Sequence, residues 1–253
     1  MFKKSIKKII NILGFDIRRR NLGEKNLSFD EILKKNLGNE PMILDVGANR
    51  GQSIKRFFNL FSNPTIHSFE PIKSEFNTMH KAYSKKKGVF LNNFALGDKY
   101  EKKEINVTIG TGKSSFNNIK LDTNYQRNRS KLLNTYANEF NSTTEQVEIK
   151  ILDDYIEEKK INIIDLIKID TQGYEDKVLS GSKKILSSNK VGIIIAEIIF
   201  DNNYDRYLTF SDLEKYLIPN NFRLVAIDLK NNNIFSSYFM ADVMYFNKDR
   251  FKI

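Results

Sequence analysis

Short apolar runs alternate with amphipathic stretches along the chain from Pro41 onward. The runs are rich in β-branched residues, as buried parallel strands are, and the stretches between them are long enough for helices. This alternation is typical of a doubly wound α/β fold, in which helices cover both faces of a mostly parallel sheet. We predict strands at residues 42–46, 65–69, 88–94, 104–109, 147–152, 163–169, 191–198, 222–228 and 238–246. We predict helices at residues 52–61, 73–83, 175–187 and 211–217.

The composition restricts the chemistry that the chain can carry out. Its 253 residues are 40% hydrophobic, which is enough to fill a core and excludes a disordered protein. The absence of cysteine excludes a disulfide framework, a thiolate zinc site and a cysteine nucleophile, and two histidines cannot build a His-rich metal centre. We expect no metal, and a divalent ion near Asp170 and Glu197 is the alternative that stays open. No apolar run reaches the roughly 18 residues of a membrane span, and the basic start lacks a secretory cleavage site. The expected location is therefore the cytoplasm.

The first 25 residues form a basic segment. They hold eight Lys or Arg residues against Asp16 and Glu24, which amounts to +6 of the total charge of +10. Apolar residues recur there at helical spacing opposite the lysines, so we predict a helical arm at residues 1–38 and a single α/β domain at residues 39–253. Three interpretations stay open for this arm: peripheral contact with the inner face of the membrane, packing on its own domain, or packing on a twin subunit in a homodimer.

A glycine-containing loop, Asp45-Val46-Gly47-Ala48-Asn49-Arg50-Gly51, follows the first predicted strand and precedes a helix. Glycines let the backbone approach a ligand, and the first amides of the helix are free to bind it. Asn49 stands where a dinucleotide fingerprint has its middle glycine, and a carboxylate at Asp45 repels a pyrophosphate but complements the cationic amino-acid part of S-adenosylmethionine (SAM). The predicted SAM contacts are Asp45, Gly47, Asn49 and Gly51. A glycine turn with Asp45 as a helix cap is the structural alternative.

Glu70 ends the next predicted strand, about 20 residues beyond the glycine loop, where open α/β sheets place an acid that binds a ribose. We therefore predict that Glu70 and Pro71 contact the ribose of the cofactor. The third strand reaches the same crevice, and the residues predicted to border adenine are Asn93, Ala95 and Leu96. The alternatives are a helix cap at Glu70 and a simple turn at Asn93.

Lys168 and Asp170 lie at the end of the strongest parallel-strand run. A lysine buried in such a strand is costly unless it is paired, and the carboxyl end of the strand is where ligands bind. Glu197, near the end of another very apolar run, meets the same burial argument. We predict that Asp170 takes the proton of an acceptor or orients it, that Lys168 holds Asp170 or the SAM carboxylate, and that Glu197 faces the substrate. A purely structural ion pair of Lys168 with a neighbouring aspartate is the alternative.

Residues 110–145 form a long polar stretch with little periodicity outside residues 130–140. Loops of this length in a compact domain are usually lids or substrate loops. We therefore predict a substrate-loop insertion that lies over the edge of the sheet.

Taken in order, six motifs of the chain resemble those of the FkbM family of SAM-dependent methyltransferases. They are Asp45 to Gly51, Phe69-Glu70-Pro71, Ala95 to Asp98, Ser114-Ser115, Leu152-Asp153-Asp154 and Leu166 to Glu175. The resemblance covers about residues 40 to 247. It implies a class I methyltransferase fold with a seven-stranded, mostly parallel sheet whose last strand is antiparallel. It also implies SAM as the cofactor and O-methylation of a sugar, a glycan or another specialised metabolite. Thr171-Gln172 stands where members of the family commonly have Val-Glu.

Two alternatives to a small-molecule methyltransferase can be tested against the sequence. A nucleic-acid methyltransferase is disfavoured, because the chain has no Pro-Pro-aromatic loop for amino-directed chemistry and no cysteine for attack on cytosine. We expect a small-molecule or glycan acceptor and no nucleic acid. The second alternative is a noncatalytic membrane-associated or partner-binding module that retains the fold, and measured SAM turnover would separate it from an enzyme.

Overall fold

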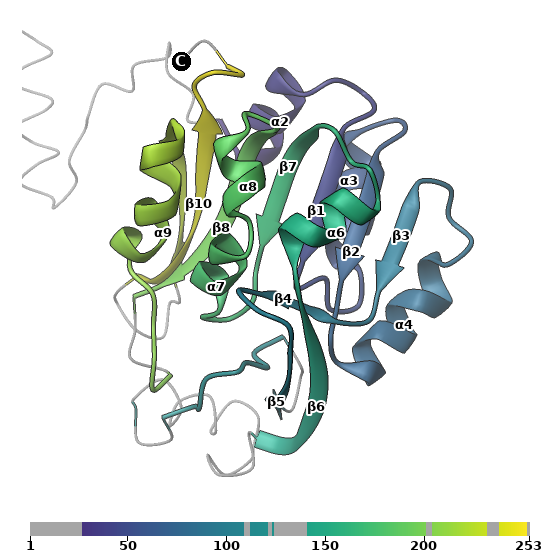
Figure 1. Cartoon of the computed structure of the whole chain (residues 1–253), viewed down its shortest axis with the longest axis vertical. Coiled ribbons are helices and arrows are strands. Elements are labelled where there is room, and N and C mark those ends of the chain that lie inside the picture. Colours follow the sequence, from purple (N-terminus) through teal and green to yellow (C-terminus); the bar gives the residue numbers. More distant parts are fainter. Residues whose placement is uncertain are drawn as a thin grey trace, which may run out of the picture.

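The computed structural model describes residues 27–108, 112–120, 123, 141–200, 204–231 and 238–251. Its main feature is a seven-stranded sheet with the strand order β3-β2-β1-β7-β8-β10-β9 (Figure 1). Neighbouring strands are parallel except for β10, which is antiparallel to both β8 and β9. The strands are β1 (Met42–Val46), β2 (Thr65–Phe69), β3 (Val89–Asn92), β7 (Ile164–Ile169), β8 (Val191–Ile199), β9 (Phe222–Asn231) and β10 (Tyr238–Asn247). The sheet predicted from the sequence is therefore confirmed, including its antiparallel last strand.

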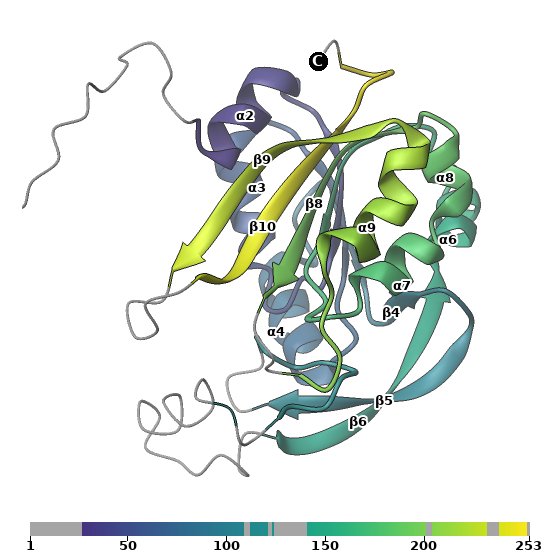
Figure 2. The same cartoon turned by 90° about the vertical axis from the view of Figure 1, so that its left-hand side faces the viewer.

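Helices cover both faces of this sheet (Figures 1 and 2). On one face, α2 (Phe29–Asn36), α3 (Gln52–Leu60) and α4 (Lys73–Tyr83) share a hydrophobic cluster with β1 and β2. On the other face, a larger cluster contains side chains of α6 (Leu152–Glu158), α7 (Glu175–Ser180), α8 (Lys183–Ser187) and α9 (Phe210–Leu217). A short 3-10 helix, Ile218–Asn220, follows α9. The predicted arm helix falls mainly on residues 1–26, which lie outside the described part of the chain.

The helix α2 lies within residues that the sequence assigned to the arm. Ser28 caps it by accepting a hydrogen bond from the amide of Glu31, and the Glu31 side chain accepts from the amide of Ser28 in return. This capping box satisfies two amides that a helix start leaves free. Phe29 and Leu33 are buried against the sheet, so α2 is part of the helical layer of the domain.

A second, three-stranded sheet lies across the carboxyl ends of the main one (Figure 2). It consists of β4 (Ala95–Gly97), β6 (Asn141–Ile151) and β5 (Glu101–Thr108), in this order. The sequence predicted strands in parts of it, but it assigned the first half of β6 to the insertion at residues 110–145. That half is polar and shows no apolar alternation. It is held by backbone pairing with β5, from Glu104↔Gln146 to Thr108↔Asn141, which composition does not reveal.

The single helix predicted at residues 175–187 is wrong, because the chain breaks it into α7 and α8 at Gly181. A Cβ atom at Gly181 would lie 2.0 Å from the carbonyl oxygen of Gly97, so the helix can pass β4 only with glycine there. The second helix then needs a cap of its own. Asp153, at the start of α6, accepts hydrogen bonds from the amides of Lys184 and Ile185 at 2.8 and 3.0 Å.

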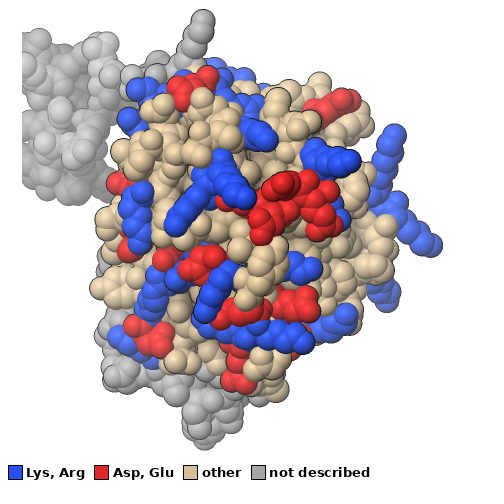
Figure 3. Space-filling model, viewed as in Figure 1, with Lys and Arg blue, Asp and Glu red and all other residues tan. Residues whose placement is uncertain are grey.

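The surface has two features that bear on partners. On the face shown in Figure 3, basic and acidic side chains are interspersed, apart from an acidic patch at the position of α6, a helix that carries two aspartates and two glutamates. Among the helices of the described residues, none combines the length and the apolar character that crossing a membrane requires.

The break at Gly181 leads to a stability prediction. Gly181→Ala should lower the free energy of unfolding by about 1–3 kcal/mol, because the new methyl group must push α7 away from β4. Urea denaturation measures this loss. Gly38→Ala is the matched control, since no atom lies within 4 Å of its Cβ position. Equal stability of the two variants would contradict the packing described here.

Candidate functional site

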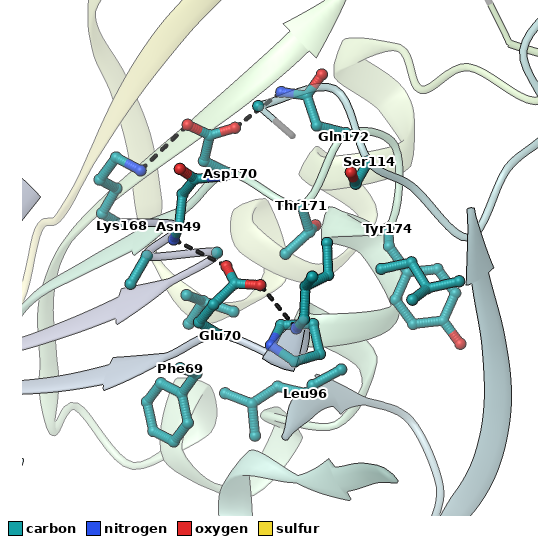
Figure 4. A pocket seen from close by; sticks show the side chains of 18 of the residues that line it. Asn49, Phe69, Glu70, Leu96, Ser114, Lys168, Asp170, Thr171, Gln172 and Tyr174 are labelled. Carbon is teal, nitrogen blue, oxygen red and sulfur yellow. Dashed lines mark hydrogen bonds and ion pairs between the residues drawn. The ribbon is translucent and has the colours of Figure 1, made fainter. Parts of the chain in front are cut away.

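A cavity of about 320 Å³ opens at the carboxyl ends of β1, β2 and β7, beneath β4 and β5 (Figure 4). In the order of the main sheet, the chain runs from β1 outward to β3 and then returns beside β1 as β7. Open α/β sheets bind their ligands at such a reversal of strand order. The predicted site residues that line the cavity are Gly47, Asn49, Glu70, Pro71, Ala95, Leu96, Lys168 and Asp170.

The glycine loop forms one wall of the cavity. Gly47 and Asn49 have positive φ angles of 82° and 49°, which turn the chain sharply after β1. A Cβ atom at Gly47 would lie 1.9 Å from the carbonyl oxygen of Asp170, so this glycine permits close contact between two loops. Gly51 has a φ of 84° and faces the ring of Tyr83 on α4 rather than the cavity. Glycine is required at this position because α3 and α4 pack closely there.

Glu70 connects the glycine loop to the start of α4. Its carboxylate accepts hydrogen bonds from the amides of Asn49 and Ile72, both at 2.8 Å. The side chain lines the cavity although it is 4% exposed, and this burial raises the pKa of Glu70 to about 7. Each carboxylate oxygen has two lone pairs, so each retains one acceptor position for a ligand.

Asp45 lies below the glycine loop and is fully buried in β1. Its Oδ1 is 3.7 Å from the Nζ of Lys168, its register neighbour on β7. Neither carboxylate oxygen accepts a hydrogen bond from the described residues. Burial raises the pKa of Asp45, and Lys168 opposes that rise. Unlike Lys168, Asp45 does not line the cavity, so the structure places this predicted cofactor contact beneath the cavity wall, where it supports Lys168.

A network of charged and amide side chains continues from Lys168 (Figure 4). The Lys168 ammonium contacts Asp170 at 3.2 Å, and the Gln172 amide donates to Asp170 at 2.9 Å and to Glu197 at 2.6 Å. Burial favours neutral Asp170, but Lys168 and Gln172 outweigh it and hold the pKa of Asp170 below its usual value. Burial likewise disfavours charge on Lys168, but Asp170 and Asp45 raise its pKa.

Glu197 lies outside the cavity, behind Gln172. Burial, together with the charge of Asp170, raises the pKa of Glu197 to about 8. The sequence predicted that Glu197 faces the substrate, whereas the structure connects it to Asp170 through one amide. Glu197 therefore belongs to the support of Asp170 in this structure.

Of the residues predicted to border adenine, two line the cavity and one does not. Ala95 and Leu96 lie on β4 and form an apolar surface with Phe69 and Ile72. Asn93 is not part of the lining. Its amide donates to the carbonyl oxygens of Glu70 and Pro71, both at 2.9 Å, so it braces the turn that carries Glu70.

Gln172 is one of several lining residues that the sequence did not single out as contacts, and it has the most polar partners among them that the structure shows here. It is 6% exposed and has a φ of 55°. Glu175 stabilises the turn by accepting hydrogen bonds from the amides of Thr171 and Gly173 at 2.8 and 3.0 Å. The replacement of the family's Val-Glu by Thr171-Gln172 was visible in the sequence. Its meaning was not, because Asp170 and Glu197, which the Gln172 amide joins, become neighbours only in the folded chain.

A further wall comes from the predicted substrate loop. Gly112, Ser114 and Phe116 line the cavity. The Ser115 hydroxyl donates to the carbonyl oxygen of Gln172 at 2.6 Å, and the Asn117 amide donates to that of Gly173 at 2.9 Å, so this segment is fixed to the turn after β7. The paired serines of the motif were its signal in the sequence. Residues 124–140 of the loop lie outside the described part of the chain.

Neither histidine reaches the cavity. His67 is buried in β2 with its Nδ1 2.7 Å from the hydroxyl of Tyr155, and burial lowers its pKa to about 4. His80 is exposed on α4. In the described residues, no group of three or more His, Asp and Glu side chains is placed to hold a metal ion.

Residues 45–224 match the family model described as the methyltransferase FkbM domain. A similar protein is the 2-O-methyltransferase NoeI of Sinorhizobium fredii, which is 26% identical over 151 residues. This match covers 60% of the present chain and 61% of NoeI, so it spans less than two thirds of that relative.

Solved structures of two methyltransferases are similar in fold. TrmK of M. capricolum, in complex with S-adenosyl-homocysteine, has a TM-score of 0.47 and 11% identity, with 88% of this chain and 70% of TrmK covered. Magnesium protoporphyrin IX methyltransferase (ChlM) from Synechocystis PCC 6803, with bound SAM, has a TM-score of 0.47 and 10% identity. Its coverage is 97% of this chain and 96% of ChlM.

The network around Gln172 predicts a pH-dependent effect on stability. Gln172→Glu replaces a shared donor with a third carboxylate and should lower the free energy of unfolding by about 1–3 kcal/mol. Crowded acids have raised pKa values in the folded state, so the folded protein binds more protons, and stability falls as pH rises. The loss should therefore be larger at about pH 8 than at about pH 5 in urea denaturation.

Gln52→Glu is the matched control, because Gln52 is exposed on α3 and its amide contacts Asn49 at 3.3 Å rather than a carboxylate. A loss of stability in Gln172→Glu that is the same at both pH values would contradict a network of interacting carboxylates.

Proposed function

Because the chain belongs to the FkbM family of SAM-dependent methyltransferases, we propose that it transfers the methyl group of SAM to a hydroxyl oxygen. The proposed acceptor is a sugar, a glycan or another specialised metabolite. The observation that carries the proposal is a single cavity lined by Glu70 from the end of β2 and by Asp170 from the end of β7. The resemblance to NoeI, a 2-O-methyltransferase, supports a hydroxyl acceptor.

The residues around the cavity fit SAM. A volume of about 320 Å³ is in the range of small-molecule sites. The free acceptor positions of Glu70, which lines the cavity, suit the ribose hydroxyls, and Lys168, which also lines it and is held by buried Asp45, suits the methionine carboxylate. The apolar surface formed by Phe69 and Leu96 suits a flat adenine ring. In this arrangement Gly47 and Asn49 line the methionine end.

SAM supplies an electrophilic methyl group on a positively charged sulfur when it is bound. The protein must then hold an acceptor hydroxyl in line with that group and receive its proton. Asp170 is ionised at neutral pH, because Lys168 and Gln172 lower its pKa, so it can accept a hydrogen bond from the hydroxyl. With SAM bound, the O–CH3 bond would form as the sulfonium S–CH3 bond breaks and the neutral thioether leaves, and Asp170 would accept the hydroxyl proton. Positioning of this kind can contribute about 7–11 kcal/mol to the rate enhancement.

Lys168 and Gln172 act on this step through Asp170. They hold its two oxygens from opposite sides, at 3.2 and 2.9 Å, and so fix the direction in which a remaining lone pair points. Glu197, with a pKa near 8, is largely protonated at neutral pH, and this limits the negative charge around Asp170. The three residues predicted as catalytic thus have different proposed roles: proton acceptor for Asp170, and support for Lys168 and Glu197.

The first test concerns cofactor binding. Glu70→Gln should weaken SAM binding at least tenfold, which corresponds to about 1.4 kcal/mol, because an amide offers one acceptor oxygen where the carboxylate has two. Isothermal titration calorimetry measures the affinity, and Glu148→Gln, exposed on β6, is the matched control. Thermal melting of both variants separates lost binding from lost folding. Unchanged affinity in a folded Glu70→Gln variant would exclude Glu70 as a cofactor ligand.

The second test concerns methyl transfer. Asp170→Asn should retain SAM binding and slow single-turnover methylation by about 10²–10⁴-fold, because the amide keeps the shape but cannot take the proton. The assay measures radioactive methyl transfer to a panel of sugars and glycans, with Asp249→Asn at an exposed position as the control. An undiminished rate would remove Asp170 from the proton transfer. A chain that binds SAM but methylates none of the panel would favour the noncatalytic alternative.

A further inference from the structure

One edge of the main sheet is long and apolar, and no strand of the described residues pairs with its outer side. The edge strand β9 has ten residues, and among the described residues it pairs on one side with β10 and with no strand on the other. Figure 2 shows β9 at the outer side of β10, away from the remaining strands. The opposite edge is formed by β3, which has four residues. Proteins usually shorten or protect such edges, because unpaired backbone groups attract other strands.

Apolar side chains accompany this free backbone. Leu224, Ile227 and Leu229 are 37%, 45% and 46% exposed. Their register neighbours on β10 are Tyr245, Val243 and Ala241, all of which are buried in the hydrophobic cluster beneath α9. The three exposed side chains therefore continue the apolar face of the core past the edge of the sheet. Val225, at the irregularity between β9 and β10, is 41% exposed as well.

The sequence of β9 is self-complementary: two copies placed antiparallel bring matching side chains together. When two copies are aligned antiparallel about an axis between Val225 and Ala226, Leu224 of one strand lies opposite Ile227 of the other. In the same alignment Arg223 lies opposite Asp228. Within one chain, Arg223 and Asp228 are register neighbours of Phe246 and Asp242, which share one face of the sheet. Apolar residues thus meet apolar residues on one face, and opposite charges meet on the other.

From this self-complementarity we propose that β9 pairs antiparallel with β9 of a second copy of this chain, which joins the two seven-stranded sheets across a twofold axis. Such a contact is isologous, so every favourable pair occurs twice. Cross-strand pairs of opposite charge and of apolar residues stabilise antiparallel strands, whereas like charges directly opposite destabilise them. The pairing does not involve the cavity and does not depend on the proposed function.

Charge exchange on β9 tests the proposed alignment. Sedimentation equilibrium of the full chain should show a dimer. Arg223→Asp and Asp228→Arg should each raise the dissociation constant of the dimer about tenfold or more, because each creates two like-charge pairs. The double variant restores both opposite-charge pairs and should return the dissociation constant to near the original value. Lys81→Asp, exposed on α4, is the matched control and should leave it unchanged.

Hydrogen exchange of the β9 amides provides a second measurement on the unmodified protein. Protection of these amides should increase with protein concentration, since it comes from the partner strand. A protein that stays monomeric at its solubility limit would overturn the proposal. So would a dimer that neither single variant weakens, a double variant that does not recover, or protection of β9 that is independent of concentration, which would indicate cover from the same chain.

Discussion

The ammonium group of Lys168 lies between two carboxylates at the centre of the sheet, 3.7 Å from Asp45 and 3.2 Å from Asp170. A buried charge of either sign is expensive without a partner, so these groups stabilise one another only while β1 and β7 keep their register. That register also places the glycine loop against the loop after β7, with Gly47 in contact with the carbonyl group of Asp170. The geometry of the cavity thus depends on a charge cluster that a shift of one residue would break.

The sequence predicted those parts of the structure that depend on local patterns. Apolar runs predicted the strands of the main sheet, and the position of Glu70 at a strand end predicted that it lines the cavity. It did not predict the division of α7 from α8, because the obstacle at Gly181 is a carbonyl group more than eighty residues earlier in the chain. The bracing role of Asn93 was missed for the same reason: a turn residue and a ligand contact look alike until their neighbours are known.

Gln172 shows how a departure from a family pattern acquires a physical meaning. The family commonly has an acid at this position, which would place a third carboxylate between Asp170 and Glu197. An amide instead donates to both carboxylates, and its oxygen is 3.3 Å from the hydroxyl of Tyr204, which donates to it. Here a neutral amide donor joins Asp170 and Glu197, where an acid would have to carry an additional proton to do the same.

The pairing of Thr108 with Asn141 joins the two ends of a segment of more than thirty residues beside the cavity. The first part of this segment is anchored, because Ser115 and Asn117 donate hydrogen bonds to the turn at Gln172 and Gly173. The entropic cost of closing a loop grows only slowly with its length, so residues inserted between this anchored part and Asn141 would cost the fold little. The wall of the cavity can thus change at one junction while the sheet beneath it keeps its register.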